Sequence, residues 1–151
     1  MELGAPVYND KEIQFAREIQ STLTDVEKEF DILSTKELKG KELSDFVEPY
    51  LESNEVMPGS TDVGDVSWVV PTAQCLTSCF ALGTPLHTWQ VVSQGATSIA
   101  HKGMLHAGKV IAATALEVMQ NPQIIAQAKA ELIQRLDGEA YVSPMPKALV
   151  Q

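Results

Sequence analysis

Three histidines carry the most versatile chemistry in this chain, because a neutral imidazole binds transition metals and titrates near neutral pH. His101 and His106 lie five positions apart, so on a helix their rings would point about 140° away from each other and could not bind one ion. His87 stands in the segment 83–90 (GTPLHTWQ), a predicted loop between a buried strand and a long helix. Functional loops of α/β sheets leave the carboxyl ends of strands, which makes His87 the first candidate for a site.

The residues alone leave two interpretations of His87 open: a surface or hydrogen-bonded histidine, or a metal ligand. For His101, in the first turn of its predicted helix, and for His106, on the polar stripe of that helix, the structural role is favoured. The sequence holds no His-x-Asp motif and no Glu-Glu doublet, so it encodes neither a compact two-metal ligand set nor a ligand beside a general base. We therefore do not expect a self-contained metalloenzyme.

The segment 58–65 (PGSTDVGD) combines glycines, hydroxyls and carboxylates, which predicts a loop. Asp62 and Asp65 could bind a metal, cap a helix or form Asx-turns, and the last two roles together are favoured. Ser60 lacks the histidine-containing motif of an activated nucleophile, so we interpret it as structural or substrate-contacting. Cys75 and Cys79 would lie about 13 Å apart along a strand, which excludes a disulfide there, and we expect both to pack in the core.

The elements that position these residues follow from hydrophobic spacing and turn residues. Asn9 with Glu12 resembles a capping box, and the apolar residues that recur at helical spacing as far as Phe30 indicate an amphipathic helix. Residues 31–57 are acidic and broken by glycine and proline, which indicates a connector or insertion. Later elements are two buried strands at 66–70 and 75–82, a loop at 83–97, a long helix at 99–119, a helix from Pro122 that Asn121 caps and Gly138 ends, and an extended tail at 141–151.

The long helix at 99–119 does not match the two strands available to cover it. It is apolar or small on nearly every face, so it needs a sheet on one side and helices on its flanks. Two strands make too narrow a sheet, and an isolated pair of strands is marginal at best. Either another chain supplies the cover or this sequence is a piece of a larger α/β domain, and we favour the second.

Charge and composition exclude two classes of partner. With 151 residues, of which 44% are hydrophobic, the chain has the composition of a globular domain. A net charge of −9 without any Lys/Arg cluster argues against nucleic acid. Neither an apolar stretch of about 20 residues nor a secretory pattern is present, so we expect a soluble, cytoplasmic protein without membrane contact.

Several motifs together resemble the closing part of the aminobenzoyl-glutamate hydrolases, which are two-metal amidohydrolases (metallopeptidases) of the aminoacylase/carboxypeptidase type. The matching segments are 57–68 (MPGSTDVGDVSW), 83–90, 98–104 (SIAHKGM), 109–115 (KVIAATA) and 141–144 (YVSP), with weaker matches at Gly4-Ala5-Pro6 and Phe15-Ala16. The resemblance implies an α/β fold: the C-terminal part of a three-layer α/β/α catalytic domain, without the smaller dimerisation domain. Residues 1–30 would then be a helix returning from that smaller domain, 31–57 an acidic connector or insertion, and 58–151 the C-terminal part of the catalytic domain.

The resemblance also implies an activity and roles for single residues. In such enzymes two divalent metal ions (zinc, manganese or cobalt) activate a water that attacks an amide next to a carboxylate-bearing amino acid, as in p-aminobenzoyl-glutamate. His87 corresponds to the last metal ligand, with His101 as the fallback, and Ser60, Thr61 and Asp62 would orient the substrate or the metal ligands. The general base and the other ligands lie in the N-terminal half of that family, so no catalytic residue is expected in this chain.

Two functions follow as hypotheses. The first is the C-terminal portion of such a hydrolase, inactive alone and completed by the N-terminal half of the same enzyme or by a companion subunit. The alternative is a non-catalytic binding or assembly module that docks on a partner chain, because a large apolar helix face marks an interaction site. A homo-oligomer is left open.

Overall fold

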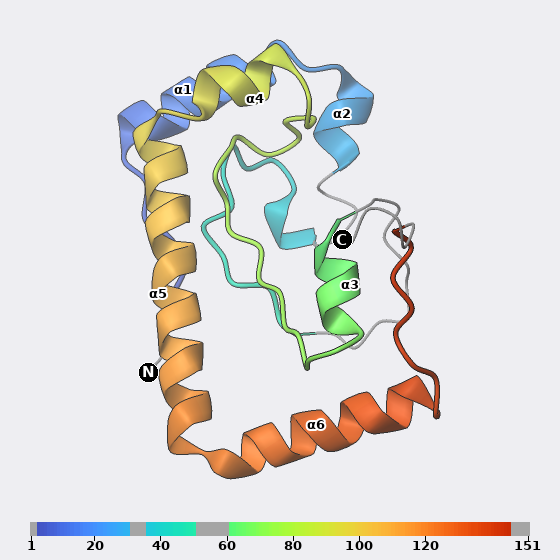
Figure 1. The fold of residues 1–151 in the computed structure, drawn as a ribbon. Coiled ribbons are helices and arrows are strands. Elements are labelled where there is room, and N and C mark those ends of the chain that lie inside the picture. The colour runs from blue at the N-terminus through green and yellow to red at the C-terminus, as the bar shows by residue number, and fades with distance from the viewer. Residues whose placement is uncertain (1–2, 31–35, 51–60, 146–151) are drawn as a thin grey trace. The chain divides into compact units, whose positions relative to one another are not determined.

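The computed structural model describes residues 3–30, 36–50 and 61–145, and this part of the chain is helical. Its elements are α1 (Asp10–Gln20), α2 (Asp25–Phe30), the 3-10 turn η2 (Lys36–Leu38), α3 (Val63–Ser67), α4 (Trp89–Gln94), α5 (Ser98–Gln120) and α6 (Pro122–Leu136) (Figure 1). The chain divides into two units. Unit 1 is Met1–Leu51 with Cys75–Ala113, and unit 2 is Glu52–Gln74 with Thr114–Gln151.

Helix α1 begins with the predicted capping box, which the structure confirms. The Asn9 side chain accepts from the backbone N–H groups of Lys11 at 3.0 Å and Glu12 at 3.1 Å, and the Glu12 carboxylate accepts from the Asn9 N–H at 2.8 Å. These bonds satisfy donors that the first turn of a helix otherwise leaves unpaired. Ala16 and Ile19 follow on the buried face.

The predicted amphipathic helix does not continue to Phe30 without a break. After Gln20 the Thr22 and Leu23 N–H groups donate to the carbonyls three residues earlier, Ile19 and Gln20, at 2.9 and 3.1 Å. The Ser21 and Thr22 hydroxyls donate at 2.7 Å to the carbonyls of Glu18 and Ile19. A second helix, α2, then starts with its own reciprocal cap: Glu27 Oε2 accepts from the Thr24 N–H at 2.7 Å.

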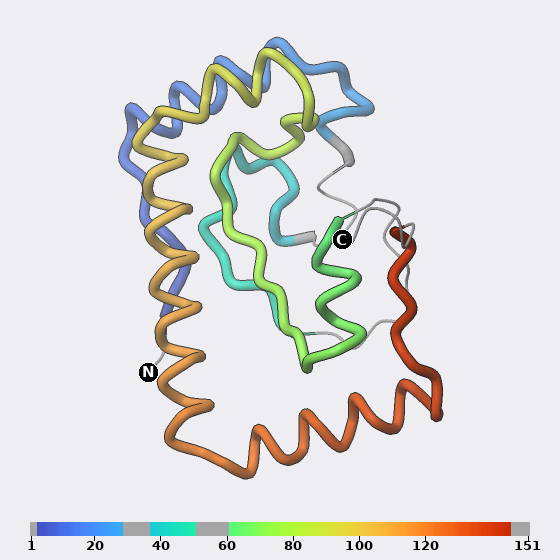
Figure 2. The backbone as a smooth tube through the Cα atoms, viewed as in Figure 1, coloured from blue at the N-terminus to red at the C-terminus, as the bar shows by residue number. Residues whose placement is uncertain are grey.

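The core of unit 1 joins four separate parts of the sequence. It contains Ala16 and Ile19 of α1, Ile99 of α5, and also Leu43 and Ala81, which lie outside the helices. Tyr8 and Phe15 pack against it. The stretches around Leu43 and Ala81 are non-helical (Figure 2). One backbone hydrogen bond joins them, from Leu82 N–H to Glu42 O at 2.9 Å, and the Gln20 amide donates to the carbonyls of Lys41 and Leu82 at 3.1 Å each.

The two predicted strands are wrong for the part of the chain that the structure describes. Most of the segment 66–70 is helix α3 and the turn that follows it, and 75–82 is extended but lies in no ladder. A strand needs a neighbour to pair its N–H and C=O groups, and residues 3–30, 36–50 and 61–145 contain no strand that could do so. The predicted three-layer α/β/α architecture is therefore not seen in these residues.

The two long helices were predicted correctly. Helix α5 runs from Ser98 to Gln120, against an expected 99–119, and α6 starts at Pro122 and ends where Asp137 and Gly138 adopt left-handed φ angles of 47° and 84°. Asn121 occupies the N-cap position as expected, but its side chain makes no cap bond and donates instead to Glu117 Oε1 at 2.7 Å. The predicted loop at 83–97 is partly wrong, since it contains α4.

In unit 2, one side-chain hydrogen bond connects α3 with the segment after α6. The Tyr141 hydroxyl donates to Asp65 Oδ1 at 3.0 Å, across 76 positions of sequence. Partial desolvation and this bond to a carboxylate raise the pKa of Tyr141. The tail expected at 141–151 is non-helical as far as residue 145, and the rest lies outside the described residues.

Candidate functional site

His87 lies on the loop between Ala81 and α4 in unit 1, with its side chain exposed. Its φ angle of 64° is in the left-handed region, which non-glycine residues seldom adopt, although histidine does so more often than most. Such a conformation persists only where the surrounding structure imposes it, and it is concentrated at functional sites. The predicted ligand is thus presented to solvent by a constrained backbone.

Both ends of this loop are fixed by hydrogen bonds. At one end, Thr84 N–H donates to Ala81 O at 3.1 Å, and the Thr84 hydroxyl donates to the same carbonyl at 2.7 Å. At the other end, the Thr88 hydroxyl donates to Pro85 O at 2.8 Å and accepts from the Val91 N–H at 3.5 Å, which caps α4. These hydrogen bonds therefore fix both ends of the loop on the surface of unit 1.

Gly83 adds a close backbone contact to this turn. It has a φ of 82°, and a Cβ placed there would lie 2.9 Å from Glu27 O and from Lys28 Cα. Only glycine combines this φ with so close an approach to α2.

Apolar side chains surround His87 in the sequence and are exposed. Leu86, Trp89 and Val92 are all more than half exposed, with Trp89 at 61%. Trp89 and Val92 are three residues apart on α4 and share a face of that helix. Exposed apolar side chains thus lie on both sides of His87 in the sequence.

The residues predicted to orient the substrate belong to unit 2. Ser60 lies outside the described residues. Thr61 is exposed, and its hydroxyl accepts from the Val63 N–H at 3.3 Å. Asp62 occupies the N-cap position of α3, but its side chain makes no cap hydrogen bond. Its exposed carboxylate is available for the substrate-orienting role.

The remaining predicted residues do not form a cluster. His101 is exposed in the first turn of α5 and His106 is half-buried further along it. Cys75 is exposed, so the prediction that it packs in the core is wrong, whereas Cys79 is half-buried. Throughout residues 3–30, 36–50 and 61–145, no three side chains of histidine, cysteine, aspartate or glutamate are grouped so that they could hold a metal ion. The role of His87 as a metal ligand therefore stays a prediction from the sequence.

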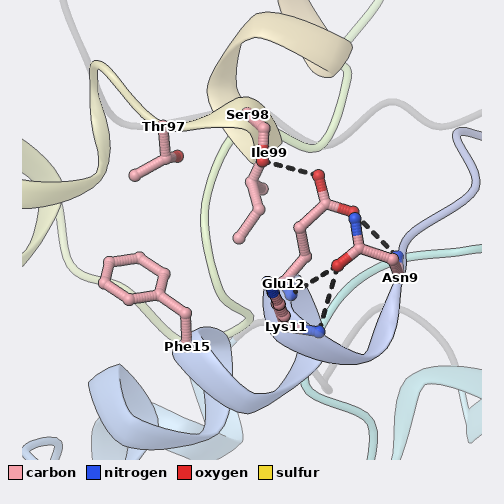
Figure 3. A pocket seen from close by; sticks show the side chains of 7 residues that line it. All are labelled: Asn9, Lys11, Glu12, Phe15, Thr97, Ser98 and Ile99. Carbon is pink, nitrogen blue, oxygen red and sulfur yellow. Dashed lines mark hydrogen bonds between the residues drawn. The ribbon is translucent and has the colours of Figure 1, made fainter.

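Sequence reasoning missed a buried ion pair that fastens α1 to α5. The Glu12 side chain is only 5% exposed, and besides the Asn9 N–H it accepts from the Ser98 hydroxyl at 2.6 Å (Figure 3). It also accepts from the Lys102 ammonium at 2.6 Å. Lys102 also donates to Val7 O at 2.8 Å. These partners lie 86 and 90 positions from Glu12, so its place in a capping box was the only signal in the sequence.

The same cluster borders a cavity of about 300 Å³ in unit 1. Its lining combines polar groups with apolar side chains of the core, as Figure 3 shows: Asn9, Lys11, Glu12, Phe15, Thr97, Ser98 and Ile99. A second cavity of about 370 Å³ is lined by residues from 5–8, Ile13 and 41–45. His87 lines neither of them, and both carboxylate oxygens of Glu12 already have hydrogen-bond partners.

The Glu12 carboxylate predicts how stability depends on pH. Burial raises its pKa, but the bonds from Lys102, Ser98 and the Asn9 N–H outweigh burial and leave the pKa lowered. Because the folded-state pKa is the lower one, the stabilisation is complete above the unfolded-state value of about 4.3 and is lost as the pH falls through the folded-state pKa. Urea unfolding between pH 7 and pH 3 is expected to show a fall in stability that is smaller in Glu12→Gln than in the wild-type chain.

The matched control for this measurement is Glu18→Gln, which neutralises an exposed carboxylate on the same helix. It is expected to keep the acid dependence of the wild-type chain. An identical fall in Glu12→Gln and in the wild type would show that the ion pair does not contribute to acid stability.

Comparison with known proteins identifies a relative for this sequence. No protein-family model and no solved structure matches it. The chain is 44% identical over 156 aligned residues to one of the subunits of p-aminobenzoyl-glutamate hydrolase from Escherichia coli (strain K12), a match that covers 95% of this chain and 32% of the relative. The chain thus spans about a third of the length of the relative that it matches. Over almost all of its own length it is similar to that hydrolase subunit, which confirms the resemblance found in its motifs.

Proposed function

We propose that this chain is the C-terminal portion of a metal-dependent amidohydrolase and contributes His87 to its metal site. The observation that carries the proposal is the 44% identity to a p-aminobenzoyl-glutamate hydrolase subunit over nearly the whole chain. The exposed imidazole on a constrained loop supports it, because a ligand for a shared site must be accessible to the residues that complete the site. The match covers only 32% of the relative, so the rest of the site is proposed to come from a polypeptide equivalent to the remainder.

The reaction proposed is hydrolysis of an amide bond to a carboxylate-bearing amino acid, with p-aminobenzoyl-glutamate as the first substrate to test. Two bound divalent ions, zinc, manganese or cobalt, would supply Lewis-acid activation of the amide and of a water. His87 would donate a nitrogen lone pair to one of them. Ser60 and Thr61, through their hydroxyl groups, and Asp62, through its carboxylate, would orient the substrate or the metal ligands.

The apolar surface of α5 supports a partner polypeptide. Beyond its buried first turns the helix exposes Met104, Leu105 and Ile111 in unit 1, each at least 60%. An amphipathic surface helix would present polar residues there, so this face is suited to cover by another element. We propose that the partner is the N-terminal half of the same enzyme or a companion subunit, and that it supplies the strands of an α/β/α domain.

None of the described helices combines the length and the apolar character that crossing a bilayer requires. The assembled enzyme is proposed to be soluble, since a net charge of −9 favours solubility, and the cytoplasm is its proposed location.

Complementation tests the proposal. The purified chain is mixed with the two thirds of the Escherichia coli relative that it does not match, and hydrolysis of p-aminobenzoyl-glutamate is measured with zinc, manganese or cobalt. Activity is expected in the mixture and in neither component alone. Hydrolysis by the chain alone, or tight stoichiometric zinc binding by it in calorimetry, would contradict the proposal that a second polypeptide completes the metal site. A stable complex without hydrolysis would contradict the proposed activity.

The exposed α5 face also favours a second candidate, a non-catalytic assembly module. Sedimentation of the chain alone distinguishes the two, because a module that docks copies of itself forms a discrete symmetric oligomer. A portion that lacks its cover is expected to give a monomer or non-specific aggregates.

A further inference from the structure

The side chain of Gln94 is completely buried and makes three hydrogen bonds. Its Oε1 accepts from the Ala81 N–H at 2.7 Å, and its Nε2 donates to Thr84 Oγ1 at 3.0 Å and to Gln90 O at 3.2 Å. A carboxamide has one acceptor oxygen and two N–H donors, so each N–H and the oxygen are used. Burial of a fully satisfied polar group in this way fixes its rotamer and specifies one arrangement of its neighbours.

Two of these partners flank the turn that leads to His87. Ala81 and Thr84 already bond to each other through the Thr84 N–H and hydroxyl, and Gln94 bonds to both residues from α4. The segment 81–84 is thus hydrogen-bonded to the buried Gln94 side chain, which comes after His87 in the sequence. Since α4 starts directly after the loop, Gln94 ties the start of the loop to the helix at its end.

We propose that Gln94 is a positioning residue that holds residues 81–88 so that His87 keeps its left-handed backbone and exposed ring before any partner binds. The left-handed φ of 64° costs free energy in a non-glycine residue and must be imposed by its surroundings. A ligand that is held in its bound geometry in advance loses less entropy when the site is completed. The use of the ring as a metal ligand rests on the proposed function, whereas the support of the loop by Gln94 does not.

Gln90 provides a matched control on the same helix. It is also a glutamine, it is 9% exposed, and its Nε2 donates to Thr22 Oγ1 at 3.4 Å, away from the loop. Replacing either glutamine by methionine keeps the length of the side chain and removes its hydrogen bonds. A general effect of lost polar groups in α4 would appear in both variants, and an effect on the loop only in Gln94→Met.

The test is solution NMR of the full 151-residue chain without metal or substrate. In Gln94→Met, the hydrogen-exchange protection of the Ala81 amide is expected to fall by about tenfold or more, because that amide loses its acceptor. The coupling between H–N and Hα of His87, together with the intraresidue nuclear Overhauser effect, is expected to lose its left-handed signature. Gln90→Met is expected to leave both signals unchanged.

Thr84→Val provides a second variant in case Gln94→Met does not fold. It removes the bond from Gln94 Nε2 and the bond from the Thr84 hydroxyl to Ala81 O, but it keeps Gln94 Oε1 as the acceptor of the Ala81 N–H. A smaller change in the same signals is therefore expected, and the double variant should not add the two effects. A left-handed His87 in a folded Gln94→Met chain would overturn the proposal, and where that variant is unfolded, signals in Thr84→Val identical to those of the wild type would overturn it. If Gln94→Met changes these signals as expected but the complemented wild-type enzyme shows no hydrolysis, the proposed function fails and the support of the loop by Gln94 stands.

Discussion

His87→Ala is expected to lower the hydrolysis of p-aminobenzoyl-glutamate by the complemented enzyme by about 100-fold or more. Removing groups that merely support metal ligands already costs about 10–100-fold in metal affinity or activity, and a ligand bonds to the ion directly. The loss should fall mainly on kcat, with metal content reduced in the same sample. Both are measured on the assembled enzyme, by steady-state kinetics and by elemental analysis of the metal.

Two other histidines control this result. His106→Ala changes a half-buried histidine of α5 and is expected to retain activity, whereas His101→Ala tests the fallback ligand in the first turn of that helix. Loss of activity in His101→Ala with activity retained in His87→Ala would move the ligand to position 101. Full activity in all three variants would remove histidines of this chain from the site.

Gly103→Ala is expected to destabilise the chain by about 1–3 kcal/mol, because it overpacks the contact between α5 and the extended segment 75–82. A Cβ at Gly103 would overlap the Ser78 carbonyl oxygen and lie 2.6 Å from Cys79 Sγ. The first neighbour is backbone and cannot turn away, so the helix or the segment must shift. The midpoint and slope of urea unfolding, followed by circular dichroism, measure the change.

Gly108→Ala on the same helix is the matched control. No atom lies within 4 Å of a Cβ placed there, so the substitution adds helix propensity without a clash. It is expected to stabilise by about 0.5–1 kcal/mol, which is opposite in sign to the effect at Gly103. Equal effects of the two substitutions would show that the contact at Gly103 is not close-packed.

The elements predicted correctly are those whose signals are local. The capping box of Asn9 and Glu12, the start of α6 at Pro122 and the long apolar run of α5 each depend on residues a few positions apart. The wrong strand at 66–70 shows the limit, since Val66, Trp68 and Val69 favour a strand only where neighbouring strands pair with them. Helix α4 was missed although Thr88 caps it, because its six residues are too few for a periodic pattern.

The candidate site was predictable only in part, for the same reason. The loop position of His87 follows from the proline and glycine around it, but its left-handed φ and the anchor at Gln94 depend on contacts across 10 and 13 positions. The partners of Glu12 lie still further away in the sequence. A sequence pattern without tertiary placement cannot assign such pairs.

The carboxylate shared between Asn9, Ser98 and Lys102 has a consequence for cooperativity. The two oxygens of the Glu12 carboxylate accept hydrogen bonds in the first turn of α1 and also pair with the Lys102 ammonium of α5. Unfolding the start of either helix therefore removes a partner from a charged group of the other. We therefore expect fraying at residue 9 to be coupled to fraying at residue 98, although about 90 positions separate them in the sequence.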